Sequence, residues 1–263
     1  LPNYNDPKIE KIISEKAEQW ATELLGYKSR WIGISIFSYE SHKIGKLLAE
    51  KIKIQDSSQK IFMGGQGVTN VNNNYPETLQ EQGLVDAYIT GEGEVSVVEF
   101  AKNNLDHPGI NKKNFIRVEK AVIDHLPSPD YSDYDLSLYG KNNLGVYGDL
   151  NDRKNVYAET QNTLPITGSR GCVRKCSYCD IPYLYPKFTH RGGFVVASEI
   201  IEKTKRNGVR KFHFTDSLIN GSMKEFRIMC ETLAKHNTDT QNNIAWSGQF
   251  IFRPKGQHTA EDW

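Results

Sequence analysis

The chain has 263 residues, 25% of them charged, and a formal net charge of +1 at pH 7. This length allows one large domain or two modest ones with a proper core, and the balanced charge gives no sign of a nucleic-acid or anionic-membrane partner. No apolar run approaches the ~20 residues of a bilayer span, and no signal-peptide pattern opens the chain. The sequence therefore predicts a cytoplasmic protein without a membrane span.

Helices and short apolar strands alternate along the N-terminal part of the chain. Asp6 can cap the first helix, and Pro7 suits its first turn. The periodicity predicts that helix to about Tyr27, and then a strand over 31–37, a helix over 42–53, a strand over 60–63, a helix over 76–82, a strand over 85–90 and a helix from 91 to about 104. Such alternation predicts a doubly wound parallel sheet, which binds ligands at the carboxyl ends of its strands.

Glycines follow the second strand at Gly64, Gly65 and Gly67. A missing Cβ lets a ligand come close to the backbone, but the same glycines can also serve only to make tight turns. The glycines alone do not decide between these two interpretations.

The succession "GISIF…FMGGQGVT…YITGEGE" resembles the second part of a cobalamin-binding Rossmann-like domain. The resemblance implies that Ser35, Gly64 and Gly65 cradle the nucleotide tail of cobalamin. Gly91 and Glu92 belong to a Gly-Glu-Gly-Glu turn that recurs in radical S-adenosylmethionine (SAM) proteins with this domain. The family usually has five strands, whereas three are expected here, and the Asp-x-His-x-x-Gly motif that ligates cobalt is missing. Histidine ligation of cobalt is therefore not part of the prediction.

Periodicity fades from Leu105 to about Asn162. Turn-forming residues fill 126–135, where an "LPxPDY" segment resembles the join between the two domains of this family. The segment is expected to be a packed surface linker, although its tyrosines and asparagines could also reach a substrate cavity. His107 and His125 are expected to be surface residues.

Three of the four cysteines stand close together, at Cys172, Cys176 and Cys179. Thiolates are the ligands of iron–sulfur clusters, and three of them leave the fourth iron of a [4Fe–4S] cluster open. A zinc site with His190 as fourth ligand and a chance grouping are the alternatives. The few cysteines suit a reducing compartment, and Cys230 is expected to be a small buried hydrophobe.

The Cys-x3-Cys-x2-Cys run resembles the signature of the radical SAM superfamily, in which an aromatic residue, here Tyr178, commonly precedes the last cysteine. The resemblance implies that the open iron takes the amino and carboxylate groups of SAM. It also implies electron transfer from the reduced cluster, cleavage of SAM to a 5′-deoxyadenosyl radical, and hydrogen abstraction from a substrate.

The C-terminal part again alternates strands and helices. A strand over 164–167 is expected to deliver the cysteine loop, and an aromatic loop over 180–186 could shield a cluster. A helix over 197–207 with Gly208 as its cap, a strand over 211–215, a helix over 223–236 and a strand over 243–247 follow. By resemblance these form the first half of a partial (β/α)6 barrel.

Asp216 and Ser217 follow a strand of this half-barrel, where chemistry is located in α/β barrels. By resemblance they hold the amino group of SAM, although the family's frequent Gly-Gly-Glu is here Thr-Asp-Ser. Asp216 could instead cap the next helix. Arg253 could pair with a carboxylate of SAM or substrate, and His213 is interpreted as structural.

Together these observations predict a fragment truncated at both ends, with a partial cobalamin-binding domain over 1–104, a linker over 105–162 and half of a radical SAM barrel over 163–263. The resemblance implies a [4Fe–4S] cluster, SAM, cobalamin, an electron donor such as flavodoxin or ferredoxin, and methyl transfer or another radical reaction. The alternatives are a methylthiotransferase, whose second cluster needs cysteines that are missing upstream of Cys172, and a non-catalytic metal-binding module.

Overall fold

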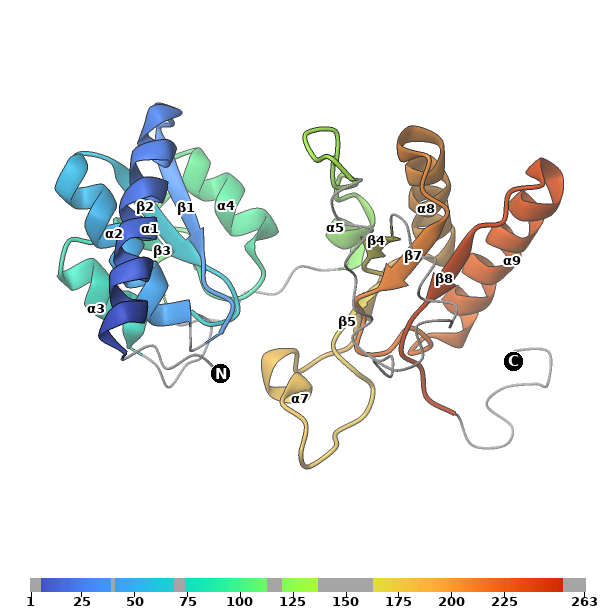
Figure 1. Cartoon of the computed structure of the whole chain (residues 1–263). Helices are drawn as coiled ribbons and strands as arrows, with labels where there is room; N and C mark the ends of the chain where they lie inside the picture. Colours follow the sequence, from blue (N-terminus) through green and yellow to red (C-terminus); the bar gives the residue numbers. More distant parts are fainter. Residues whose placement is uncertain (1–5, 39–40, 69–73, 113–119, 137–162, 253–263) are drawn as a thin grey trace. The chain divides into compact units, whose positions relative to one another are not determined.

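The chain folds as two compact units, Leu1–Val118 and Glu119–Trp263. The computed structural model describes residues 6–38, 41–68, 74–112, 120–136 and 163–252 (Figure 1). No described helix combines the length and the apolar character that a membrane span requires. The predicted domain boundaries at 104 and 162 stay predictions, and Arg253 lies outside the described residues.

The first unit is built on a three-stranded parallel sheet in the order β1–β2–β3. Its elements are α1 (Pro7–Gly26), β1 (Trp31–Ser35), α2 (Ser41–Gln55), β2 (Lys60–Gly64), α3 (Tyr75–Glu81), β3 (Ala87–Tyr88) and α4 (Gly93–Ala101). The predicted alternation of strands and helices is therefore confirmed in this unit.

Helix α1 begins as its sequence predicts. The carboxylate of Asp6 accepts a hydrogen bond from the backbone N–H of Lys8 at 2.9 Å, and Pro7 occupies the first turn, where its missing N–H costs nothing. Small side chains, Ala17 and Ala21, are completely buried on the face of α1 that packs on α2. Small residues at this contact let the two helices approach closely.

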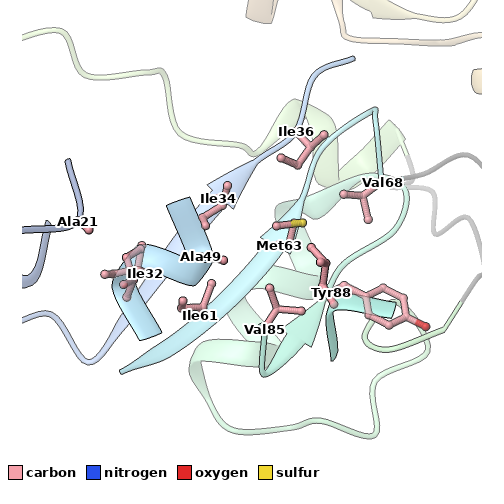
Figure 2. Packing of buried hydrophobic residues seen from close by; sticks show 12 residues of the cluster. Ala21, Ile32, Ile34, Ile36, Ala49, Ile61, Met63, Val68, Val85 and Tyr88 are labelled. Carbon is pink, nitrogen blue, oxygen red and sulfur yellow. The ribbon is translucent and has the colours of Figure 1, made fainter. Parts of the chain in front are cut away.

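Alternation along the strands gives the sheet two apolar faces. Ile32 and Ile34 of β1 and Ile61 and Met63 of β2 point into one cluster, which also holds residues of α1, α2 and α3 (Figure 2). Phe62, between the last two, points to the opposite cluster, which includes side chains of α4. Helices thus cover both faces, as a doubly wound sheet requires.

The second unit contains the parallel sheet β4–β7–β8 and a separate two-stranded antiparallel ribbon, β5–β6. Its elements are α5 (Lys120–Asp124), β4 (Thr163–Ile166), β5 (Ser169–Arg170), α7 (Ile181–Leu184), β6 (Thr189–His190), α8 (Gly193–Asn207), β7 (Lys211–Phe214), α9 (Met223–Thr240) and β8 (Ala245–Ser247). Leu164, Phe212 and Phe214 pack against α8 and α9 on one face of the sheet. On the other face Pro165 and His213 are exposed.

Three local predictions need correction. The segment 180–186 is not only loop, because Pro182 stands in the first turn of the short helix α7. Helix α8 begins at Gly193, four residues before its predicted start. Cys230 is half-buried rather than buried, because it lies at the margin of the core, and desolvation there raises the pKa of its thiol to about 11.

Candidate functional site

Two of the predicted cobalamin contacts are neighbours at the carboxyl edge of the first sheet. Ser35 ends β1 and pairs in parallel register with Gly64, which ends β2. The Ser35 side chain is exposed, so its hydroxyl is available to a ligand at this edge. The chain then turns, and the backbone N–H of Gly67 donates to the carbonyl of Ile36 at 2.8 Å.

Gly64 and Gly65 are glycines for different reasons. Gly65 has a φ of +99°, and a Cβ there would lie 2.5 Å from the carbonyl oxygen of Ile36, so the turn itself requires glycine. At Gly64 φ is not positive, and a Cβ would meet only ordinary contacts, of which the nearest is the carbonyl of Ile89 at 3.5 Å. The fold therefore does not require glycine at Gly64.

The Gly-Glu-Gly-Glu turn links β3 to α4. Gly91 has a φ of +80°, which favours glycine, and Glu92 occupies the position before the first residue of α4. The Glu92 side chain is only 7% exposed. Gly91 thus shapes the turn, whereas the carboxylate of Glu92 lies inside the unit rather than at its surface.

The cysteine loop leaves the second sheet after β4 and is fastened at both ends. β5 pairs with β6 through Ser169–His190 and Arg170–Thr189. Below this ribbon the backbone N–H of Arg191 donates to the carbonyl of Gly168 at 2.8 Å. The residues between the two strands, 171–188, therefore form a closed loop at the carboxyl end of β4.

Within this loop, Cys176 is exposed and Cys172 and Cys179 are partly exposed. The backbone N–H of Cys179 donates to the carbonyl of Cys176 at 3.1 Å, and that of Arg174 donates to the Sγ of Cys172 at 3.4 Å. In the described part of the chain, no three His, Cys, Asp or Glu side chains stand close enough to hold a metal ion. The donor set fits an iron–sulfur cluster, and the loop would have to draw its sulfurs together around it.

The other predicted residues near this loop differ widely in exposure. Tyr178 is 90% exposed, whereas Asp216 is 4% exposed. Ser217 is half-buried. His190 belongs to β6, and its Nδ1 lies 3.2 Å from the carbonyl oxygen of Arg191. The described structure does not bring His190 and the cysteines together in the arrangement that the zinc alternative needs.

Asp216 has its partners at the start of the cysteine loop. One carboxylate oxygen accepts from the backbone N–H of Gly168 at 2.9 Å, and the other lies 2.5 Å from the hydroxyl of Ser169. Burial raises the pKa of Asp216, and these hydrogen bonds act in the opposite direction. The structure thus places this carboxylate beneath the loop.

One further group was not apparent from the sequence. Arg191, Glu199 and Lys203 form a buried ionic chain, with Glu199 2.6 Å from Arg191 and 3.0 Å from Lys203. The Arg191 guanidinium also donates to the carbonyl of Thr167 at 3.0 Å, which ties α8 to the cysteine loop. The (i, i+4) spacing of Glu199 and Lys203 was the only signal of this network in the sequence.

No protein-family model matches the chain. An anaerobic magnesium-protoporphyrin IX monomethyl ester cyclase of Synechocystis is 25% identical over 165 residues, which is 62% of this chain and 32% of the cyclase. A putative methylthiotransferase of Methanocaldococcus jannaschii is 25% identical over 202 residues, 74% of this chain and 39% of that protein. The chain thus spans between about a third and two fifths of these relatives.

The fold is similar to that of a radical SAM methyltransferase, TsrM of Kitasatospora setae. With tryptophan and a SAM analogue bound, that structure matches with a TM-score of 0.59 and 16% identity over 86% of this chain and 44% of TsrM. With cobalamin and a [4Fe–4S] cluster bound, the TM-score is 0.55 and the identity 19%. These findings confirm the α/β fold class, and the fold of the chain is similar to that of TsrM.

Proposed function

We propose that the chain is part of a radical SAM enzyme whose cluster is held by Cys172, Cys176 and Cys179. The observation that carries the proposal is the placement of three thiols on one closed loop at the carboxyl end of β4, the edge where α/β proteins bind their ligands. Three thiolates leave one iron of a [4Fe–4S] cluster for SAM. When bound, the reduced cluster supplies the electron that cleaves SAM to a 5′-deoxyadenosyl radical.

The chain's own residues have three tasks in this proposal. The β5–β6 ribbon and Asp216 hold the loop at its base. Tyr178, almost fully exposed beside Cys179, is free to cover the adenine end of SAM. A cluster held by these cysteines would need an electron donor to reduce it, for which a flavodoxin or a ferredoxin is the expected class.

The first unit is proposed to bind cobalamin at the edge formed by Ser35, Gly64 and Gly65. The support is that Gly64 has no role in the fold that requires glycine, and that its register partner, Ser35, presents an exposed hydroxyl. TsrM, whose fold is similar, contains both cobalamin and a cluster. Methyl transfer to a substrate radical is the reaction that this pairing of cofactors favours, with cyclisation, the activity named for the Synechocystis relative, as another outcome of the same chemistry.

A methylthiotransferase is the second candidate, because the Methanocaldococcus relative carries that name and aligns over 74% of the chain. Such an enzyme holds a second cluster on three further cysteines. The sequence contains no cysteine before Cys172, so this candidate requires that they come from elsewhere.

Electron paramagnetic resonance of the anaerobically reconstituted, reduced protein tests the proposal. We expect the wild type to hold about four irons per chain and to give a [4Fe–4S]⁺ signal that changes shape when SAM is added. The Cys176→Ala variant should lose both the iron and the signal. Cys230→Ala, which alters a half-buried cysteine on α9, is the matched control and should keep the signal. Zinc in place of iron, or a cluster whose signal ignores SAM, would overturn the radical SAM assignment.

A further inference from the structure

The carboxylate of Asp216 is hydrogen-bonded inside the second unit. It follows β7, and it reaches across to the residues that follow β4, where it accepts from the Gly168 N–H at 2.9 Å and contacts the Ser169 hydroxyl at 2.5 Å. Only 4% of the residue is exposed, and each carboxylate oxygen already has a hydrogen-bond partner inside the unit. A residue that accepts from the ammonium group of SAM has to present a free oxygen at the strand edge.

The Ser169 hydroxyl links Asp216 to a second point of the fold. Its oxygen also lies 3.0 Å from the carbonyl oxygen of Leu218, which is completely buried. A hydroxyl has one proton, so it can donate to only one of these two acceptors at a time. An amide in place of the carboxylate could donate to Ser169 while Ser169 donates to Leu218, and its oxygen could still accept from Gly168.

Two threonines present exposed hydroxyls at this edge. Thr167 follows β4 and Thr215 follows β7, both side chains are exposed, and their hydroxyl oxygens are 2.8 Å apart. The backbone N–H of Thr215 donates to the carbonyl of Ile166 at 2.9 Å. This bond continues the backbone pairing of β4 with β7 and so holds the two threonines side by side. Two adjacent hydroxyls offer both a donor and an acceptor, as the carboxylate and ammonium of an amino acid require.

We infer that Asp216 is a positioning residue that holds the base of the cysteine loop, and that the Thr167–Thr215 pair, rather than Asp216, meets the amino-acid end of SAM. The inference rests on the proposed function for the identity of the ligand. It separates two roles at one strand edge: fastening the loop from inside, and contacting the cofactor from outside.

Three variants of the reconstituted protein separate these roles. Asp216→Asn can keep all three contacts, so it should retain the iron content and the SAM affinity of the wild type within about twofold. Asp216→Ala leaves the Gly168 N–H without its acceptor, so iron content should fall several-fold. Thr215→Val, of nearly the same shape, should keep the cluster and weaken SAM binding by roughly tenfold, a loss of one hydrogen bond to a charged group.

A measurement on the cluster-free protein makes the first role testable without any cofactor. Amide hydrogen exchange of residues 168–170 should be about tenfold faster in Asp216→Ala than in the wild type, and nearly unchanged in Asp216→Asn. Should Asp216→Ala fail to fold, Ser169→Ala removes one of the two contacts and should accelerate exchange of the same residues by a smaller factor.

The outcomes are distinct. An Asp216→Asn variant that keeps its cluster but loses SAM would show that the charge of Asp216 binds the cofactor, and would overturn the inference. Unchanged exchange in both Asp216→Ala and Ser169→Ala would overturn the positioning role, and normal SAM binding by Thr215→Val would overturn the role of the threonine pair. If the wild-type protein holds no cluster, the proposed function fails, while the exchange rates still decide whether Asp216 holds the loop.

Discussion

Gly64 and Gly65 are adjacent in sequence, but we expect them to respond oppositely to alanine. In Gly65→Ala the new side chain would have to adopt a φ of +99° and would lie 2.5 Å from the carbonyl oxygen of Ile36 and 3.0 Å from the Ser35 hydroxyl. The left-handed backbone costs about 1–3 kcal/mol, and relieving a contact with backbone adds a cost on the order of 1 kcal/mol. The expected loss of stability is therefore about 2–4 kcal/mol.

In Gly64→Ala the backbone is not in the left-handed region, and the nearest atom to the new Cβ is 3.5 Å away. The substitution should change the free energy of unfolding by no more than about 0.5 kcal/mol, or stabilise slightly by restricting the unfolded chain. The added methyl group lies at the edge where the nucleotide tail of cobalamin is proposed to bind. We expect cobalamin affinity to fall at least tenfold, equivalent to about 1.4 kcal/mol.

Urea unfolding followed by circular dichroism measures the first quantity, and absorbance titration with hydroxocobalamin measures the second. We expect opposite results for the two variants: Gly65→Ala is less stable than the wild type, whereas Gly64→Ala is as stable as the wild type but binds cobalamin more weakly. If Gly64→Ala bound cobalamin as tightly as the wild type, the explanation of Gly64 as a ligand-facing position would be refuted. If Gly65→Ala had the same urea midpoint of unfolding as the wild type, the turn would not require glycine at this position.

Two further substitutions test an electrostatic contact in the first unit and a helix contact in the second. Burial opposes ionisation of Asp86, but hydrogen bonds from Lys60 and from the backbone, together with the charge of Lys53, outweigh burial and lower the pKa of Asp86 below 3.8. The ionised carboxylate therefore stabilises the fold above pH 3.8. This stabilisation is lost as the pH falls through the pKa of the folded state. Asp86→Asn should cost about 1–2 kcal/mol in urea unfolding at pH 7 and much less near pH 3, and an equal cost at both pH values would contradict this. In Gly193→Ala the new Cβ would clash with the backbone carbonyl of Glu225, where α8 packs against α9. We expect this clash to lower stability by about 2–4 kcal/mol, measured by thermal unfolding. A melting temperature equal to that of the wild type would show that the two helices can move apart at no cost.

The elements with local signals were predictable from the sequence. Asp6 and Pro7 mark the start of α1, and Gly208, with a φ of +68°, ends α8 as a left-handed cap. These signals act over a few residues, so no tertiary information is needed to find them. The parallel direction of β1, β2 and β3 was predicted from the alternation of strands with helices, whereas their order in the sheet was found only in the structure.

The elements missed by sequence reasoning depend on contacts distant along the chain. β5 and β6 have two residues each, too few to show any periodicity, and exist because they pair with one another. Helix α8 begins at Gly193 because this glycine fits against the backbone of α9, whereas in sequence a glycine pair is typical of a break. Asp216 has the residue type and the position of a cofactor ligand. Its partners, Gly168 and Ser169, are found only when the pairing of β4 with β7 is known.

The closed cysteine loop also affects how a cluster can be lost. Joining the ends of a loop as long as 171–188 costs on the order of 2–3 kcal/mol of chain entropy, and the β5–β6 ribbon and the bond from Arg191 to Gly168 meet that cost during folding of the polypeptide. Binding of the proposed cluster would then not have to supply that free energy. Damage to a cluster by oxygen would therefore be a local event, which leaves the loop fastened at both ends and ready to be rebuilt.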